Sequence, residues 1–339
     1  MTQNDVILSI KPLGFMWPTT NPFLFCAHHL DEYPAGNEEM GPAGSLAGRD
    51  MGQDFTPKDG WRMYHGHKVP GFPVHPHRGF ETITIVRTGM VDHSDSHGQA
   101  GRYGKGDVQW MTAGAGLQHS EMFPLLNMEE GNKTELFQIW LNLPKAKKFA
   151  EPYFKMLWSE DIPTYKVRGE NGKTTEINII AGGCEQIHSL PVAPDSLAAD
   201  PLNEVAIWTV MMEAEALWEI PSSGVGISRT IYFHAGDSLK INETAVEVSN
   251  AVEVKAGHKL LIKNGNSACQ LLLLQGKPIE EPVVQYGPFV MNSQAEIQQA
   301  MNDYRRTEFG GWPWPMHEMV HPMSKGRFAR YSDGREEHR

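Results

Sequence analysis

The chain has 339 residues with 30 basic and 41 acidic side chains, a formal net charge of −11 when the histidines are neutral. This length fits two domains, each large enough to bury its own core. A net negative charge disfavours contact with a phosphate backbone, and the densest basic cluster, Lys145, Lys147 and Lys148, is short. We therefore expect no direct nucleic-acid binding.

The chain lacks the features of membrane and secreted proteins. No stretch approaches the roughly 20 apolar residues of a membrane-spanning helix, and the first residues lack the basic-then-apolar pattern of a secretory signal. Cys26, Cys184 and Cys269 are scattered and odd in number, so they cannot form a disulfide framework. These features predict a cytoplasmic protein with reduced thiols and no membrane association.

Short β-rich runs separated by glycine-containing turns recur along the chain. They lie at residues 81–86, 136–143, 176–181, 205–211, 230–233 and 259–262. Strands at this spacing without long helices between them predict an all-β fold, a sandwich or small barrel. Two similar barrels, in residues 1–150 and 151–339, account for the length, and residues 145–162 are the expected connection.

Three segments depart from this pattern. Residues 36–68 are rich in Gly, Met and Asp and predict a long loop inserted in the first barrel. The pattern of residues 293–306 predicts a helix. Ser293 is its expected N-cap, and Glu296, three residues later, completes a capping box with it. Residues 310–339 are rich in Pro, Trp, Met and His, and we expect a tail that is draped over the body or partly disordered.

Two pairs of potential metal ligands stand out. His75 and His77 flank Pro76 in a predicted strand, where alternate side chains share a face about 7 Å apart. Pro76 cannot donate to a β-ladder and belongs at a strand start, an edge or a bulge. His119 and Glu121 repeat the same spacing. If the two segments are neighbouring strands, three imidazoles and one carboxylate converge on one interior point.

This ligand set constrains the metal. Three neutral nitrogens and one carboxylate suit Fe(II), Mn, Ni, Co or Zn and disfavour Ca or Mg. Four ligands on an octahedral ion leave two adjacent positions open, as is typical of a catalytic or sensory site. The alternative to a metal site is that these histidines are packed or surface residues that bind no metal. A second pair, His65 and His67, lies in a segment without strand periodicity, and we interpret it as solvated loop.

The tail contains a competing motif. Residues 317–321 read His-Glu-Met-Val-His, formally the H-E-x-x-H motif of zinc proteases. That chemistry needs both histidines one turn apart on a stable helix. Pro315 precedes the motif and Pro322 follows it at once, which leaves too little room for such a helix. We interpret the motif as accidental.

The spacing of His75, His77, Glu81, Gly89 and His119 resembles the two motifs of the cupin superfamily. The blocks GFPVHPHRGFETITIV, GDVQWMTAGAGLQHSEM, IWLNLP and EPVVQYGPFVMNSQAEIQQAMNDYR resemble the signature blocks of the pirin family. They run in the same order from about residue 70 to residue 306. The resemblance implies a bicupin, two jelly-roll barrels of the double-stranded β-helix type with a C-terminal helix.

The resemblance also implies the metal and its ligands. Pirins bind iron through positions that correspond to His75, His77, His119 and Glu121, so Fe(II) is the expected metal, with Mn, Ni, Co, Cu and Zn left open. Glu81 occupies the carboxylate position of many other cupins and is expected here either to support the metal ligands or to be structural. The second barrel is expected to be metal-free, and its lone His234 and His258 to be packed or surface residues.

Two functions follow from the resemblance. The first is an oxidoreductase similar to quercetin 2,3-dioxygenase, which opens a flavonol ring with O2 and releases carbon monoxide, with Glu121 as the catalytic base. The second is a non-enzymatic iron- or redox-responsive regulator that binds transcription factors or metabolic enzymes. Both use the same four ligands, so the sequence does not separate them. The 36–68 loop ends just before His75, and we hypothesise that it partly covers the site.

Overall fold

The computed structural model describes residues 6–339, which divide into two units. Unit 1 contains the residues up to Ala27, Ile139–Asn142 and Glu160–Glu280, and unit 2 contains His28–Gln138, Leu143–Ser159 and Glu281–Arg339. The sequence suggested one boundary near residue 150. Instead the final segment of the chain folds with residues 28–138, because its strands and helix pack there.

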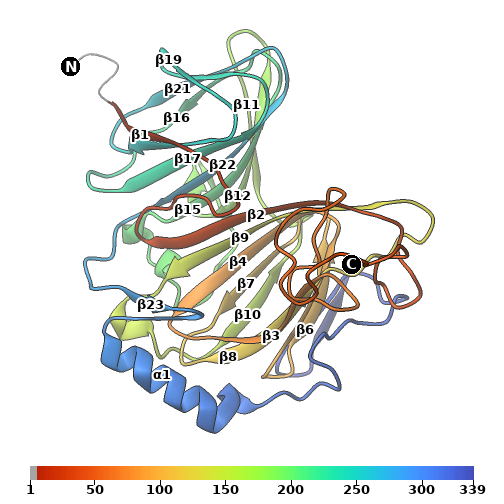
Figure 1. The fold of residues 1–339 in the computed structure, drawn as a ribbon. Helices are drawn as coiled ribbons and strands as arrows, with labels where there is room; N and C mark the ends of the chain where they lie inside the picture. Colours follow the sequence, from red (N-terminus) through yellow and green to blue (C-terminus); the bar gives the residue numbers. More distant parts are fainter. Residues whose placement is uncertain (1–5) are drawn as a thin grey trace. The chain divides into compact units, whose positions relative to one another are not determined.

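Unit 2 contains most of a barrel of two sheets, called here the N-terminal barrel (Figure 1). Its five-stranded sheet has the order β10-β7-β4-β9-β2, formed by Tyr153–Leu157, Val108–Thr112, Phe80–Thr88, Asn132–Asn142 and Phe23–Tyr33. Its six-stranded sheet has the order β26-β25-β6-β5-β8-β3, formed by Glu336–His338, Phe328–Arg330, Ala100–Gly104, Met90–Asp95, Leu117–Met122 and Gly71–His77. The runs expected at residues 81–86 and 136–143 are strands.

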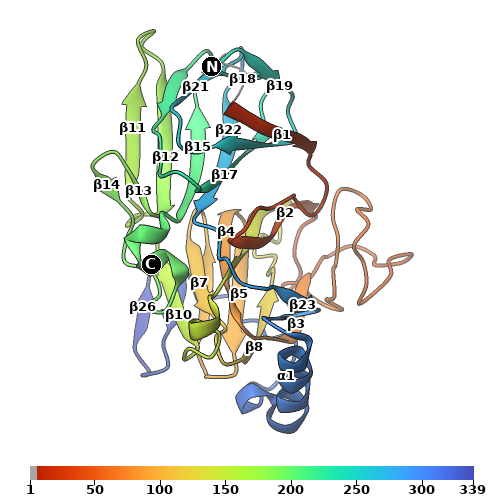
Figure 2. The same cartoon turned by 90° about the vertical axis from the view of Figure 1, so that its left-hand side faces the viewer.

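Unit 1 contains the second barrel, called here the C-terminal barrel (Figure 2). Its seven-stranded sheet has the order β1-β20-β17-β22-β15-β12-β11, formed by Ile7–Pro12, Asn250–Lys255, Ser228–Ala235, Cys269–Gly276, Ala206–Met212, Thr174–Ala181 and Thr164–Arg168. Its four-stranded sheet has the order β16-β21-β18-β19, formed by Leu217–Ile220, Leu260–Asn264, Leu239–Ile241 and Thr244–Val246. Smaller elements are the hairpin Gly183–Cys184 (β13) and Ile187–His188 (β14), and the 3-10 turns Leu197–Ala199 (η3) and Pro201–Asn203 (η4).

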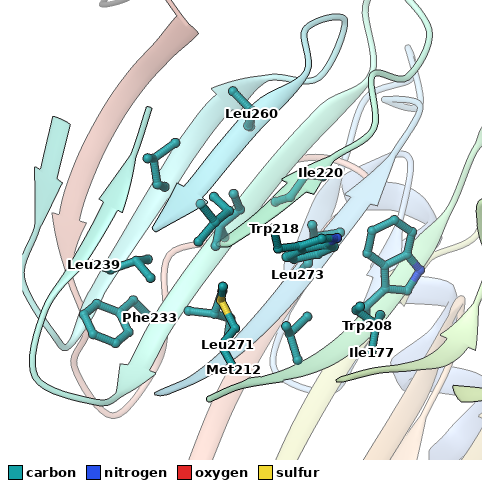
Figure 3. Packing of buried hydrophobic residues seen from close by; sticks show 14 of the residues in the cluster. Ile177, Trp208, Met212, Trp218, Ile220, Phe233, Leu239, Leu260, Leu271 and Leu273 are labelled. Carbon is teal, nitrogen blue, oxygen red and sulfur yellow. The ribbon is translucent and has the colours of Figure 1, made fainter. Parts of the chain in front are cut away.

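Apolar side chains fill the C-terminal barrel (Figure 3). Successive strand residues point to opposite faces, so Ile231 and Phe233 of β17 point inward together, as do Leu271 and Leu273 of β22. All four are at most 1% exposed. Burying one such side chain contributes about 1.5–3 kcal/mol to folding, so this core is the main source of stability for the unit.

The expected helix is confirmed as α1, Gln294–Thr307. The side chain of Ser293 accepts a hydrogen bond from the Glu296 amide, as an N-cap should. Ile297 and Ala300 are buried against the hairpin of β23 (Val284–Tyr286) and β24 (Phe289–Met291), and the 3-10 turn η5 (Glu308–Gly310) follows. Within residues 6–339, no helix combines the length and apolar character needed to span a membrane.

The segment expected as a connection, residues 145–162, is partly a strand. It begins with the 3-10 turn η2 (Lys145–Lys147) and continues into β10, which pairs antiparallel with β7. The pairing runs from Tyr153 opposite Thr112 to Leu157 opposite Val108. Residues 153–157 read Tyr-Phe-Lys-Met-Leu, without an alternation of apolar and polar side chains, so this edge strand has no clear signal in the sequence.

The tail is ordered and forms part of the N-terminal barrel. Strand β25 pairs with β6, with Phe328 opposite Arg102. The buried Arg102 guanidinium binds both Asp92 carboxylate oxygens at 2.7 Å and donates to three backbone carbonyls of the tail. The tail thus lies against the barrel, as the first of the two expected alternatives has it. Residues 317–321 are not helical, which agrees with an accidental H-E-x-x-H motif.

The 36–68 loop is anchored by a buried charged network. The guanidinium of Arg62 donates to both carboxylate oxygens of Asp31, at 2.9 and 3.1 Å, and the Tyr64 hydroxyl donates to the same carboxylate at 2.6 Å. Met63 and Tyr64 are fully buried. Within the expected solvated pair, His67 is exposed, whereas His65 is half-buried with Nδ1 2.6 Å from the Gly52 carbonyl.

Candidate metal centre

Three histidines converge inside the N-terminal barrel. Strands β3 and β8 pair antiparallel with His75 directly opposite His119, and His77 lies two residues further along β3. The ring centroids are 4.4 Å apart for His75 and His119, 4.8 Å for His75 and His77, and 5.0 Å for His77 and His119. One nitrogen of each ring lies within 4.8 Å of the others. The segments that carry His75 and His119 are therefore neighbouring strands, which was the condition for the predicted convergence of the ligands.

Hydrogen bonds fix which ring nitrogens are free to ligate. Nδ1 of His75 lies 2.8 Å from the Pro73 carbonyl, which leaves Nε2 as its ligating atom. The His77 ring donates a hydrogen bond to the backbone carbonyl of Pro288. Nε2 of His119 is buried and has no hydrogen-bond partner among residues 6–339. A buried nitrogen left in this way costs about 1–3 kcal/mol, and a bound transition metal would satisfy it.

Burial keeps the three imidazoles in the form that binds a metal. It lowers the pKa of His75 to about 4 and the pKa values of His77 and His119 well below the ordinary value. The His75 ring further lowers the pKa of His77, and the His75 and His77 rings lower the pKa of His119, since a second positive charge nearby is unfavourable. The rings are therefore neutral at physiological pH, as metal ligation requires.

Glu121 stands at the edge of the histidine cluster. Its Oε2 is 3.7 Å from Nε2 of His119, and its carboxylate accepts hydrogen bonds from Thr84 at 3.2 Å and Gln138 at 3.0 Å. Burial raises the pKa of Glu121 to about 7, although both hydrogen bonds oppose that rise. The donor set of three imidazole nitrogens and one adjacent carboxylate fits a divalent transition metal.

Sequence reasoning missed His93, which supports the site from β5. The ring is fully buried, with Nδ1 3.4 Å from Nδ1 of His119 and Nε2 3.4 Å from an Asp95 oxygen, and it stacks on Phe154. Strand β5 pairs with β8 so that His93 lies opposite Glu121. The alternation of His93 and Asp95 was the available signal, but only the strand pairing reveals its target.

Two further features complete the site. Glu81 is fully buried and accepts hydrogen bonds from Trp110 at 2.9 Å and Thr112 at 2.8 Å, which agrees with the expected structural role. Phe72, on β3, lies 6.3 Å from the His75 ring and contacts Tyr64 from the 36–68 loop at 5.1 Å between centroids. The loop therefore contributes to an aromatic wall beside His75.

Two barrels of paired antiparallel sheets, one with a histidine cluster inside, are typical of double-barrel cupins. Comparison with known proteins agrees with this class. The Pirin family model matches residues 39–141, and the model of the Pirin C-terminal cupin domain matches residues 207–310. Pirin-1 of Arabidopsis thaliana is 38% identical over 244 residues, which cover 71% of this chain and 78% of that protein. The chain belongs to the pirin family.

Two further similar proteins carry the name quercetin 2,3-dioxygenase. A Pseudomonas aeruginosa protein provisionally named quercetin 2,3-dioxygenase is 36% identical over 241 residues, covering 70% of this chain and 79% of that protein. The crystal structure of quercetin 2,3-dioxygenase from Acinetobacter baumannii superimposes with a TM-score of 0.69 at 27% identity, over 90% of this chain and 98% of that one. The predicted family and the predicted fold of two cupin barrels with a C-terminal helix are thus confirmed.

Proposed function

We propose that the protein is a metal-dependent dioxygenase acting on flavonols such as quercetin, with one metal held by His75, His77, His119 and Glu121. The observation that carries this proposal is the cluster of three neutral imidazoles, with His77 and His119 buried and His75 half-buried. It contains the unpartnered Nε2 of His119 and has a carboxylate at its edge. The name of the Acinetobacter structure supports the choice of reaction.

Each residue has a distinct part in this proposal. A metal bound here supplies Lewis-acid activation and a template that brings an aromatic hydroxyl close to dioxygen. Glu121 takes the proton of the flavonol hydroxyl, because it is the carboxylate nearest the cluster. Thr84 and Gln138 orient that carboxylate through their hydrogen bonds. Phe72 offers the flat polyphenol an apolar face beside His75.

The activity test is aerobic turnover of quercetin by protein loaded separately with Fe(II), Mn, Ni, Co, Cu or Zn. We expect at least one metal form, Fe(II) first, to consume quercetin and release an equal amount of carbon monoxide. If every metal form binds metal and none turns over quercetin, the enzymatic proposal is wrong and the regulatory alternative stands.

The ligand set is tested by metal content. We expect one metal per wild-type chain, and His119→Ala should lose most of it because one of four ligands is removed. His258→Ala, at an exposed position of the C-terminal barrel, is the matched control and should keep the metal. Two equivalents of similar affinity in the wild type, or full metal in His119→Ala, would show the assignment to be wrong.

The lid hypothesis for residues 36–68 remains a proposal. Deletion of residues 40–60 leaves Arg62 and Tyr64, which anchor the end of the loop, in place. We expect faster metal exchange and altered quercetin kinetics in a variant whose thermal unfolding shows that it is folded. Unchanged exchange and unchanged kinetics in that folded variant would argue against a lid.

A further inference from the structure

The C-terminal barrel contains a cavity of about 400 Å³ at one end of its seven-stranded sheet. Arg229 at the start of β17 lies directly opposite Gln275 at the end of β22, and both line the cavity. Arg229 shares a strand face with Ile231 and Phe233 of the barrel core, so its side chain points into the barrel. Trp208 of β15 lines the same cavity.

Two residues that line this cavity each carry a buried donor without an acceptor among residues 6–339. Arg229 is 1% exposed, and its Nε donates to Gln275 at 2.7 Å, whereas its Nη1 is buried without a hydrogen-bond partner among residues 6–339. The indole nitrogen of Trp208 is buried and unpartnered in the same way. Gln275 is itself fixed by hydrogen bonds to the Glu204 carbonyl at 3.0 Å and the Ser223 hydroxyl at 3.1 Å. Burying a guanidinium whose only direct acceptor is a neutral amide is costly, so the arrangement favours an anionic ligand.

The charges around the cavity restrict that anion. Burial lowers the pKa of Arg229 to about 10, so the guanidinium stays positive at neutral pH. The Glu204 carboxylate attracts it only at longer range and accepts hydrogen bonds from the Ser223 hydroxyl and the Gly224 amide instead. Glu185 and Asp200 add negative charge to the lining. One negative group is therefore favoured beside Arg229, and a polyanion is repelled.

We propose that this cavity binds a small organic monocarboxylate, whose carboxylate accepts hydrogen bonds from Nη1 of Arg229 and Nε1 of Trp208. A guanidinium and an indole N–H are strong donors to a carboxylate, and the Trp208 ring offers an apolar surface to the rest of the molecule. The site belongs to the C-terminal barrel alone and does not depend on the metal.

The test is calorimetric titration of the full-length protein with benzoate, propionate, citrate and inorganic phosphate. We expect saturable one-to-one binding of a monocarboxylate and at least tenfold weaker binding of citrate and phosphate. Arg229→Gln should weaken that binding by about 10- to 100-fold, since a hydrogen bond to a charged group is lost. Arg168→Gln, at an exposed position of the same sheet, is the matched control and should bind as the wild type does.

A second variant keeps the test decisive if Arg229→Gln does not fold. Trp208→Phe keeps an aromatic ring and removes only the N–H donor, so we expect a severalfold loss of affinity in a folded protein. Absence of monocarboxylate binding to the wild type would overturn the proposal. Phosphate binding as tight as that of benzoate, or unchanged affinity in both folded variants, would overturn it equally.

Discussion

The two barrels share one architecture and differ in what their inner faces carry. The C-terminal barrel fills its interior with Ile, Leu, Val and Trp side chains and places its buried arginine at one end. The N-terminal barrel buries histidines and carboxylates of β3, β4, β5 and β8. Such groups are tolerated inside only when hydrogen bonds or ligands satisfy them. The same frame thus yields a stable apolar core in one case and a polar candidate metal site in the other.

The largest expected effect concerns Glu121, which acts in our proposal both as ligand and as base. In Glu121→Gln the amide oxygen still coordinates, but it cannot accept the flavonol proton, so turnover should fall by about 10²–10⁴-fold. Flavonol binding should change much less. The measurement is turnover with excess Fe(II) beside a flavonol titration on the same sample. Near-normal turnover of the metal-saturated variant would leave Glu121 as a ligand only.

The apolar barrel should respond to a core truncation that leaves the metal site untouched. Leu273 is fully buried, so Leu273→Ala should reduce the free energy of unfolding by about 2–5 kcal/mol. Metal content should not change. Leu202→Ala, at a position 77% exposed, is the control and should shift stability by less than about 0.5 kcal/mol. Metal loss in Leu273→Ala under native conditions would mean that metal binding in the N-terminal barrel depends on the core packing of the C-terminal barrel.

A smaller effect is expected from His93, which acts through His119. His93→Phe keeps the stack on Phe154 and removes the nitrogen beside His119, so metal affinity should fall by about 10- to 100-fold. The control is His97→Phe, at an exposed position after the same strand. A competition titration with Zn(II) measures both. Equal affinities in the two variants would remove His93 from the support of the site.

The smallest effect, taken over a single pH unit, is a pH dependence of metal binding. Without metal the pKa of Glu121 is raised to about 7, so below pH 7 metal binding must displace its proton. Burial lowers the pKa of His75 to about 4 and the pKa values of His77 and His119 also lie well below the ordinary value, so no imidazole proton competes between pH 7 and 5. Zn(II) affinity should fall about tenfold per pH unit in that range. A steeper fall would show that the histidines titrate there.

Local signals predicted much of the fold and the centre of the site. Ser293 and Glu296 place the start of α1 within one residue, because capping is a short-range interaction. The alternation rule places His75 and His77 on one face, and the pairing of β3 with β8 brings His119 to them. The irregular register between Phe72 and His75 could not be read from the sequence, because it depends on the partner strand.

Features that depend on distant partners were missed. His93 becomes significant only through its contact with His119, and β10 only through its pairing with β7. The tail has no alternation of its own and is ordered by Arg102 and by β6. A residue whose structural role depends on a partner distant in the sequence leaves no pattern among its own sequence neighbours.

The pairing of β6 with β25 also sets the order of events during synthesis. Residue 328 follows residue 104 by 224 positions (328 − 104), so at 5–20 residues per second the ribosome needs roughly 10–45 s to supply the partner of β6. Until then the nascent chain presents an open strand edge, and the Arg102 guanidinium lacks its three carbonyl acceptors. The sheet that carries the histidines is thus completed only after residues 328–330 have been translated, and a chain that terminates before them leaves that edge available for aggregation.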